Sequence, residues 1–353
     1  MNRTGSAAAA MVVAACLMAS ACSLDGVLRN DDAKTIRIGY AVPVLASPYW
    51  AQNVSFAQTM AGQLGAKLRV VDADSNESKQ LKNIQNLISL GVHAIVYAPV
   101  TASVGSSILE SCETAKIKCV AMARQPGVAP DSTNAAFNVG YVVGNDKADG
   151  EAAAAVLTDG GAKSCVAMSG QQGNSVADDR LKGFQDYATA HGVKTLNTFR
   201  PAEVASEGQR ATESFLAAYP GPGFDCLFAF NGDGATGAIS ALKAKGALAK
   251  VKVAALDANP DNLKAIQSGD LLASAAGGEY LDGGFATIMA YDAVKGFMPP
   301  QRQVVLDGIV VTNANVDQYT ARFGSAAAGY DAKQLSLAYN PSAPSNRFTL
   351  KLN

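Results

Sequence analysis

The sequence has very few of the residues that catalysis and nucleic acid binding most often require. Its 353 residues include only two histidines, which leaves little material for a histidine-rich metal site or a histidine-centred triad. The formal net charge is −1, so there is no positive field to hold nucleic acid phosphates. Apolar residues make up 48 % and charged residues 17 %, which is ordinary for a folded chain. At about 150 residues per domain, this length favours two domains.

Familiar catalytic signatures are also missing. No lysine follows a glycine-rich loop, no His-Glu-x-x-His occurs, and no two cysteines have zinc-site spacing. Asp72–Asn76 begins like a calcium loop, but Glu77 stands where that loop needs glycine. We therefore expect no metal, no cofactor and no enzymatic activity. One alternative stays open: Gly232–Gly237 has the glycine pattern of a dinucleotide site and Asp257 ends a later strand, as in a secreted dinucleotide-dependent enzyme.

The N-terminus resembles a bacterial lipoprotein signal. A short basic start precedes the apolar run Ala7–Met18, which is too short to span a bilayer, and small residues then lead to Cys22. The pattern predicts a signal peptide over 1–21, lipidation of Cys22 and a polar tether over 22–34, with Cys16 as a second candidate. No later segment reaches the roughly 18 apolar residues of a membrane span. We expect a chain outside the cytoplasm, anchored to the bacterial membrane by lipid.

Four cysteines remain after the signal: Cys112, Cys119, Cys165 and Cys226. Outside the cytoplasm, an even number of thiols is typical of disulfides. Cys112 falls late in a predicted helix with Cys119 on the next strand, and Cys165 and Cys226 begin two strands expected to be neighbours. We predict Cys112–Cys119 and Cys165–Cys226 bridges, and the alternative is four buried thiols.

Short apolar runs alternate with amphipathic stretches along most of the chain. One such helical stretch carries Leu81, Ile84 and Leu87 and is closed by Gly91, and the same alternation begins again at Cys165–Met168. Strands that alternate with helices in this way predict parallel sheets built from βαβ units. The sequence thus predicts an α/β fold of two doubly wound parallel-sheet lobes, with ligand sites at the carboxyl ends of the strands.

Aromatic residues follow the first predicted strand. In Ser47-Pro48-Tyr49-Trp50, Ser47 is suited to cap a helix and Pro48 to occupy its first position. Tyr49 and Trp50 would then lie on the first helical turn beside the crevice, where rings stack on the apolar faces of a sugar. The alternative is a hydrophobic contact at a helix start.

Charged and amide side chains stand at other strand ends. Arg124, Asn231 and Asp257 each end a predicted strand, and together they offer paired donors and acceptors that suit neighbouring hydroxyl groups. Arg180 is expected in the first turn of a helix, where a cation opposes the helix dipole. Its structural alternative is a salt bridge to Asp178 or Asp179.

These motifs resemble those of the type I periplasmic solute-binding proteins, in the ribose-binding-like group that serves sugar ABC importers. The resemblance runs from about Thr35 to Phe323. It implies a cleft between the lobes that closes on a ligand. Two departures stand out, because Ala123 replaces an acid before Arg124 and Gly277 replaces a hinge glutamine. The ligand-binding residues that the resemblance implies are Ser47, Tyr49, Trp50, Arg124, Arg180, Val204, Asn231, Asp257 and Gly277.

The resemblance also implies the domain organisation and the partners. The first lobe is expected over 35–143 plus 279–306, the second over 144–278 plus 307–335, and an irregular tail over 336–353. Three crossings near Gly144, Gly277 and Leu306 would form the hinge. The implied function is hinge closure on a sugar or sugar alcohol by a monomer that delivers it to an ABC permease. A receptor for a sugar-like signalling molecule is the alternative, whereas the lipoprotein signal disfavours a sugar-responsive repressor.

Overall fold

The computed structural model describes residues 35–130, 134, 136–221, 223–324 and 329–352. The predicted signal peptide, the tether and both lipidation candidates, Cys16 and Cys22, lie outside these residues. Arg37–Asn353 forms one compact unit. Among the described residues, no helix combines the length and the apolar character needed to cross a membrane.

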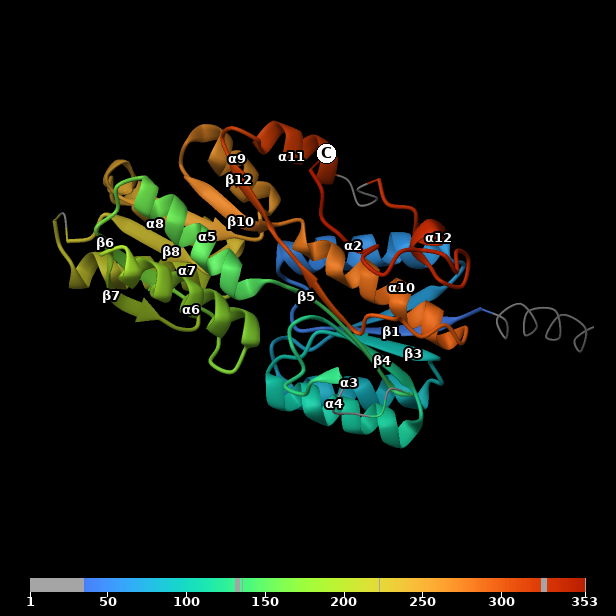
Figure 1. Cartoon of the computed structure of the whole chain (residues 1–353). Helices are drawn as coiled ribbons and strands as arrows, with labels where there is room; N and C mark the ends of the chain where they lie inside the picture. The colour runs from blue at the N-terminus through green and yellow to red at the C-terminus, as the bar shows by residue number, and fades with distance from the viewer. Residues whose placement is uncertain (1–34, 131–133, 135, 222, 325–328, 353) are drawn as a thin grey trace, which may run out of the picture. The chain divides into compact units, whose positions relative to one another are not determined.

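The first sheet contains six parallel strands in the order β11-β5-β4-β3-β1-β2. Helices α2 (Pro48–Gln63) and α10 (Asp282–Val294) pack on one face, and α3 (Glu77–Ser89) and α4 (Ala102–Ala115) cover the other (Figure 1). The strands are β1 (Arg37–Val42), β2 (Lys67–Asp72), β3 (Ala94–Tyr97), β4 (Lys118–Ala123), β5 (Asn138–Gly144) and β11 (Gln303–Leu306).

The second sheet has the order β12-β10-β9-β8-β6-β7, parallel except for β12. Helices α5 (Asp146–Asp159) and α6 (Ser175–Ala190) lie on one face, and α7 (Ala205–Ala218) and α8 (Gly232–Ala244) pair on the other. Two α/β lobes of this kind confirm the predicted fold class. The remaining elements are β6 (Ser164–Met168), β7 (Lys194–Phe199), β8 (Cys226–Ala229), β9 (Lys252–Leu256), α9 (Pro260–Ser268), β10 (Ala273–Gly277), β12 (Ile309–Thr312) and α11 (Val316–Phe323).

Hydrophobic periodicity explains why these segments fold as they do. Strand β3 is buried along its whole length, as expected for a central parallel strand covered on both faces. Helix α3 buries Ile84 and Leu87 against the first sheet, while its other side is exposed. After α6 and α9, Gly192 and Gly269 take φ values of +73° and +79°, so both helices end where glycine permits left-handed backbone.

The chain passes between the two sheets at three places. It leaves the first sheet at Gly144 and enters α5 at Asp146, and it returns from the second sheet between Gly277 and the 3-10 helix η3 (Glu279–Leu281). The third passage joins β11 to β12 across Asp307-Gly308. A side chain at Gly144 would collide with the Glu279 carboxylate, so two of the crossings are in direct contact.

The glycine pattern at Gly232–Gly237 serves helix packing. A Cβ at Gly237 would collide with the carbonyl oxygen of Ala205, and a Cβ at Gly208 with that of Gly234. Helices α7 and α8 therefore approach each other closely through these glycines. The first turn of α8 is capped by the Asn231 side chain, which accepts a hydrogen bond from Gly234 N at 2.9 Å. The motif is thus explained without a pyrophosphate.

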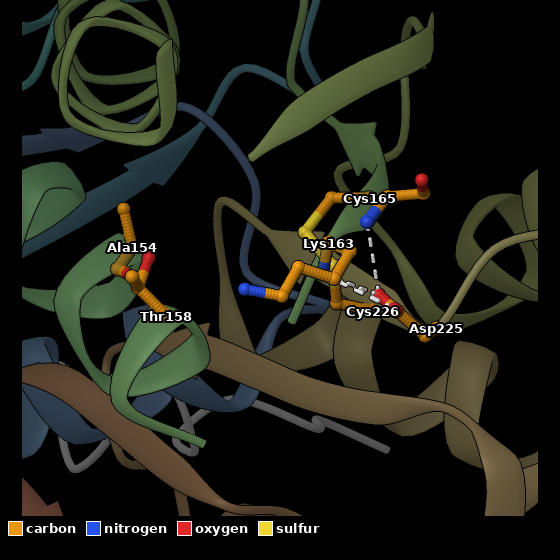
Figure 2. Close-up of a disulfide and its surroundings, with 7 residues drawn as sticks. Ala154, Thr158, Lys163, Cys165, Asp225 and Cys226 are labelled. Atoms are coloured by element: carbon orange, nitrogen blue, oxygen red, sulfur yellow. Dashed lines mark hydrogen bonds between the residues drawn. A yellow bond between two sulfur atoms is a disulfide. The ribbon is translucent and has the colours of Figure 1, made fainter. Parts of the chain in front are cut away.

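Among the described residues, two disulfides link elements of the sheets, one in each lobe. Cys112 at the end of α4 is joined to Cys119 on β4, with a Cα–Cα distance of 6.3 Å. Cys165 and Cys226 are directly opposed on neighbouring parallel strands, with Cα atoms 4.4 Å apart. Beside this second bridge, the Asp225 carboxylate accepts hydrogen bonds from the backbone N–H of Lys163 at 3.0 and 3.1 Å (Figure 2).

The C-terminal segment returns to the first lobe. Helix α12 (Ala332–Leu335) contacts α2, where Ala332 N donates to Gln63 Oε1 at 2.7 Å. Farther on, the Phe348 ring stacks on Phe285 of α10 with centroids 5.0 Å apart. The family resemblance implies that residues up to 335 belong to the second lobe. In the structure, the Tyr330 ring packs edge to face on Phe56 of α2 and on Phe285 of α10, so this part of the chain contacts the first lobe.

Candidate ligand-binding site between the lobes

The cleft between the two sheets is lined by residues from both lobes. Its volume is about 50 Å³, small compared with the roughly 300–1,000 Å³ of drug-sized sites. The lining comes mainly from strand ends and helix starts, as expected for doubly wound sheets. It consists of Val44, Ser47, Tyr49, Trp50, Ala123, Arg124, Asn174, Val176, Arg180, Glu203, Phe230, Asn231 and Asp257.

The start of α2 supplies the aromatic part of the first-lobe wall. Pro48 begins the helix after Ser47, so Tyr49 and Trp50 lie on the first turn, as predicted. Their rings pack edge to face with centroids 5.1 Å apart. The Tyr49 hydroxyl donates to Asp282 Oδ2 at 3.3 Å, which fixes the ring against α10. The wall therefore presents rigid apolar faces with the polar end already satisfied.

Arg124 stands at the end of β4 beside these rings. Its guanidinium lies over the Trp50 ring, 5.8 Å from the centroid. Nη1 donates to the backbone carbonyls of Pro99 and Val100 at 3.3 and 3.1 Å, which anchors the side chain to the first lobe. Burial lowers the pKa of Arg124, although Glu203 opposes that shift.

Arg180 connects the cleft to the hinge. It is 3 % exposed, and its guanidinium pairs with Asp257 at 2.6 Å, Asp146 at 2.8 Å and Glu279 at 2.9 Å. Asp146 and Glu279 immediately follow two of the crossings, whereas Asp257 directly follows β9. The alternative salt bridge to Asp178 or Asp179 is wrong, because the ion-pair partners of Arg180 are the three acids above and Asp178 pairs with Arg200 at 2.6 Å. Arg180 also lies in the second turn of α6 and not in the first.

Acidic side chains around Arg180 exceed its single positive charge. Burial raises the pKa of Asp146 to about 7 and that of Asp149 to about 6. Burial and the neighbouring Asp149 raise the pKa of Glu279 well above its usual range. The carboxylate oxygens of Asp146, Asp149 and Glu279 lie within 4.8 Å of one another, but Arg180 already pairs with two of these groups. Arg180 and retained protons therefore offset much of the negative charge of the cluster.

Asn231 and Asp257 come from the second lobe. The Asn231 amide is largely engaged in structure, since Oδ1 caps α8 and Nδ2 donates to the Glu203 carbonyl at 2.9 Å. Asp257 has φ +80°, and Ala123 across the cleft has φ +57°. Left-handed backbone at residues other than glycine is strained and often marks functional sites.

Two predicted ligand-binding residues do not line the cleft. Val204 precedes α7 outside the lining, and its neighbour Glu203 occupies the wall instead. Gly277 faces the Ile309 carbonyl and the Tyr319 ring, where a Cβ would be 2.7 and 2.9 Å away, so it serves strand packing. At this crossing, Glu279 is the residue that reaches Arg180.

Several lining residues were missed by the sequence analysis. Glu203, Asn174 and Phe230 follow or precede predicted elements, and Val44 and Val176 complete the apolar lining. Glu203 carried a usable signal, because it is a lone acid in the loop after a predicted strand. An asparagine before a helix, such as Asn174, is indistinguishable in sequence from an ordinary cap.

Comparison with known proteins gives consistent matches. The family model of the periplasmic binding protein domain matches residues 38–297. The ribose import binding protein of Salmonella typhimurium is 26 % identical over 262 residues, covering 73 % of this chain and 85 % of the relative. The xylitol-binding protein of Mycolicibacterium smegmatis is 29 % identical over 328 residues, covering 90 % of this chain and 87 % of the relative.

A solved structure agrees with the sequence matches. The periplasmic binding protein component of the arabinose ABC transporter from Shewanella sp. ANA-3 superimposes with a TM-score of 0.73 and 26 % identity, covering 83 % of this chain and 98 % of that chain. These relatives are named as binding proteins or as transporter components and not as enzymes. The cleft, the hinge and the matches together establish that this chain belongs to the type I periplasmic binding proteins, in the ribose-binding-like group of sugar importers.

Proposed function

We propose that this protein captures a neutral sugar or sugar alcohol by closure of its two lobes and delivers it to an ABC importer. The observation that carries the proposal is the composition of the cleft wall, in which Trp50 and Arg124 of the first lobe face Asp257 and Glu203 of the second. An aromatic face with carboxylates and guanidinium groups suits a ring or chain that carries hydroxyls on apolar carbons.

The charge around the cleft favours a ligand without a negative charge. Arg180 donates to Asp146, Asp257 and Glu279 and to the carbonyl of Phe230, so most of its hydrogen-bonding capacity is used within the protein. A ligand carboxylate would approach this excess of acids, and the Arg124 guanidinium beside it already faces the Glu203 carboxylate at 3.8 Å. Hydroxyl groups, in contrast, donate to carboxylates readily.

The named relatives support the same ligand class. The matched proteins are named for ribose, xylitol and arabinose, which are small polyhydroxylated molecules. The absence of an acid at Ala123 and of glutamine at Gly277 argues against the usual ribose pose of the family. The match to the xylitol-binding protein covers 90 % of this chain, so a pentitol is the first ligand to test.

The contacts between the lobes support hinge closure as the mechanism. Three crossings join the lobes, and the lobes also touch directly, since Gln125 N donates to Ser175 Oγ at 3.0 Å and Ala102 N donates to the Gly173 carbonyl at 3.2 Å. A ligand that contacts both lobes binds the closed arrangement better than the open one and shifts the population toward it.

The family membership implies work outside the cytoplasm, and we propose that a lipid on Cys22 retains the protein at the membrane. Retention would keep the loaded protein close to the permease, where high local concentration favours the encounter.

The test is a thermal-shift screen of the purified protein, followed by calorimetry on each hit. The panel contains xylitol, ribitol, D-arabinitol, D-ribose, D-xylose, L-arabinose and myo-inositol, with D-xylonate as the anionic control. At a ligand concentration of about 100 Kd, binding to the native state alone stabilises it by about 2.7 kcal/mol, which is easily detected. We expect at least one neutral member to raise the melting temperature and the sugar acid to leave it unchanged. A screen without any neutral hit would refute the proposal.

A further inference from the structure

The wall of the cleft contains three polar groups whose hydrogen-bonding capacity is unused. Asn174 Oδ1 is buried without a partner, in a residue that is 1 % exposed. Glu203 Oε2 lies 3.8 Å from Arg124 Nη2, which is too far for a direct hydrogen bond. Within the described part of the chain, Arg124 Nη2 donates no hydrogen bond. All three residues line the same cleft.

Each of these groups is held in place by its own lobe. Glu203 Oε1 accepts hydrogen bonds from Gln171 N at 2.9 Å and from Asn174 Nδ2 at 3.3 Å, so the carboxylate and the amide are fixed to each other. Gly170 lets the Glu203 side chain approach, because a Cβ there would lie 2.6 Å from Oε1. The Arg124 guanidinium is anchored on the first lobe through the carbonyls of Pro99 and Val100.

The unused groups have complementary roles toward hydroxyls. A hydroxyl both donates and accepts, so a single one placed between Glu203 Oε2 and Arg124 Nη2 would bond to both lobes at once. A neighbouring hydroxyl would donate to Asn174 Oδ1, whose burial without a partner is otherwise costly. From this juxtaposition we propose that Glu203, with Arg124 and Asn174, forms a subsite for a pair of adjacent hydroxyls and determines which stereoisomer the protein binds. The inference rests on the proposed function and identifies the part of the ligand that sets specificity.

The subsite also explains how the protein tolerates Ala123. That position lacks the acid that the resemblance leads one to expect before Arg124. Glu203 brings a carboxylate to the same guanidinium from the opposite lobe. The Glu203 carboxylate and the Arg124 guanidinium belong to different lobes. A hydroxyl that bonds to both is therefore bound well only when the lobes are closed.

The test compares Glu203→Gln with wild type by calorimetry. Glutamine keeps the size of the side chain and removes its charge. The matched control is Glu213→Gln, an exposed acid on α7 that contacts Gln209. The probes are xylitol, ribitol and D-arabinitol, which differ only in the orientation of their hydroxyls, or D-ribose, D-xylose and L-arabinose if wild type prefers an aldopentose.

We expect Glu203→Gln to weaken binding of the preferred isomer about 10- to 100-fold, as for a charge-assisted hydrogen bond. The affinities for the other isomers should fall less, so the difference in affinity between the preferred isomer and the others should become smaller. A merely structural role would weaken all isomers equally and would lower the melting temperature of the free protein. Asn174→Ala should also reduce the difference in affinity between the isomers. It provides a second variant if Glu203→Gln folds poorly.

The two proposals fail in different ways. If wild type binds no neutral member of the panel, the proposed function is wrong and the subsite falls with it. If wild type binds and Glu203→Gln retains both its affinity within about twofold and its order of preference, only the subsite is refuted. An equal loss for every isomer would also refute it.

Discussion

Lowering the pH from 8 to 6 should stabilise this protein, contrary to what is expected where carboxylates are held mainly by salt bridges. The cause is a group of buried acids, namely Asp146 and Asp149 in the cluster around Arg180 and Asp233 in the first turn of α8. Burial raises the pKa of Asp146 to about 7, and it raises the pKa values of Asp149 and Asp233 to about 6 each. Because these values lie above the ordinary value of 3.8, the folded state binds protons more tightly than the unfolded chain.

The size of the effect follows from these values. For Asp146, proton uptake between pH 8 and pH 6 adds on the order of 1 kcal/mol to the free energy of unfolding, while the unfolded chain remains ionised. Asp149 and Asp233 each add less than Asp146 over the same interval, because a group with a pKa of about 6 takes up its proton mainly at and below pH 6. At about 2 °C per kcal/mol for a chain of this length, the melting temperature should rise by a few °C. The gain is lost again as the pH rises through 7, and it stops growing near pH 4, where the unfolded chain also takes up protons.

The assay is thermal denaturation at pH 6, 7 and 8 at constant ionic strength, with urea unfolding to convert the shifts to free energies. Asp146→Asn mimics the protonated side chain and should remove most of the pH dependence. Asp159→Asn, an exposed acid at the other end of α5, is the matched control and should retain it. A wild-type melting temperature that falls as the pH is lowered from 8 to 6 would refute this prediction. So would an Asp146→Asn variant whose melting temperature depends on pH as strongly as that of wild type.

Three further outcomes are expected. Asp257→Asn should weaken ligand binding about tenfold or more by calorimetry, with little change in the melting temperature of the free protein, because Arg180 keeps its other acid partners; near-normal affinity would mean that the ligand lies elsewhere. Cys22→Ala should move the protein from membrane to soluble fractions or block its processing, and unchanged retention would assign the anchor to Cys16 or remove it. Replacing both cysteines of the Cys165–Cys226 pair should cost about 4 kcal/mol of stability and replacing the Cys112–Cys119 pair about 2 kcal/mol, since the first closes a loop of 61 residues and the second one of 7; urea unfolding that ranks them in reverse would contradict the loop-entropy argument.

The sequence by itself determined the fold class and the general position of the site. Parallel strands need crossover helices, so alternating apolar runs and amphipathic stretches leave few architectures open. Side chains at the carboxyl ends of such strands must meet at one edge of a sheet, which is why Trp50, Arg124, Arg180, Asn231 and Asp257 all line the cleft. Such local patterns can be recognised in the sequence because they depend on residues that are neighbours along the chain.

Only the tertiary structure decided how these side chains are used. Arg180 lies 34 residues from Asp146, 77 from Asp257 and 99 from Glu279, and no spacing in the sequence relates the four. Glu203 lines the cleft and Val204 does not, because of the path of the loop before α7. The hydrophobic pattern of the sequence does not predict that path. The pKa of Asp146 likewise depends on burial, which is a property of the packed cluster and not of the residue type. Contacts between distant segments form only when the sheets and the hinge place them together, so their pairing is settled by packing and by the cost of leaving charges unpaired in the interior.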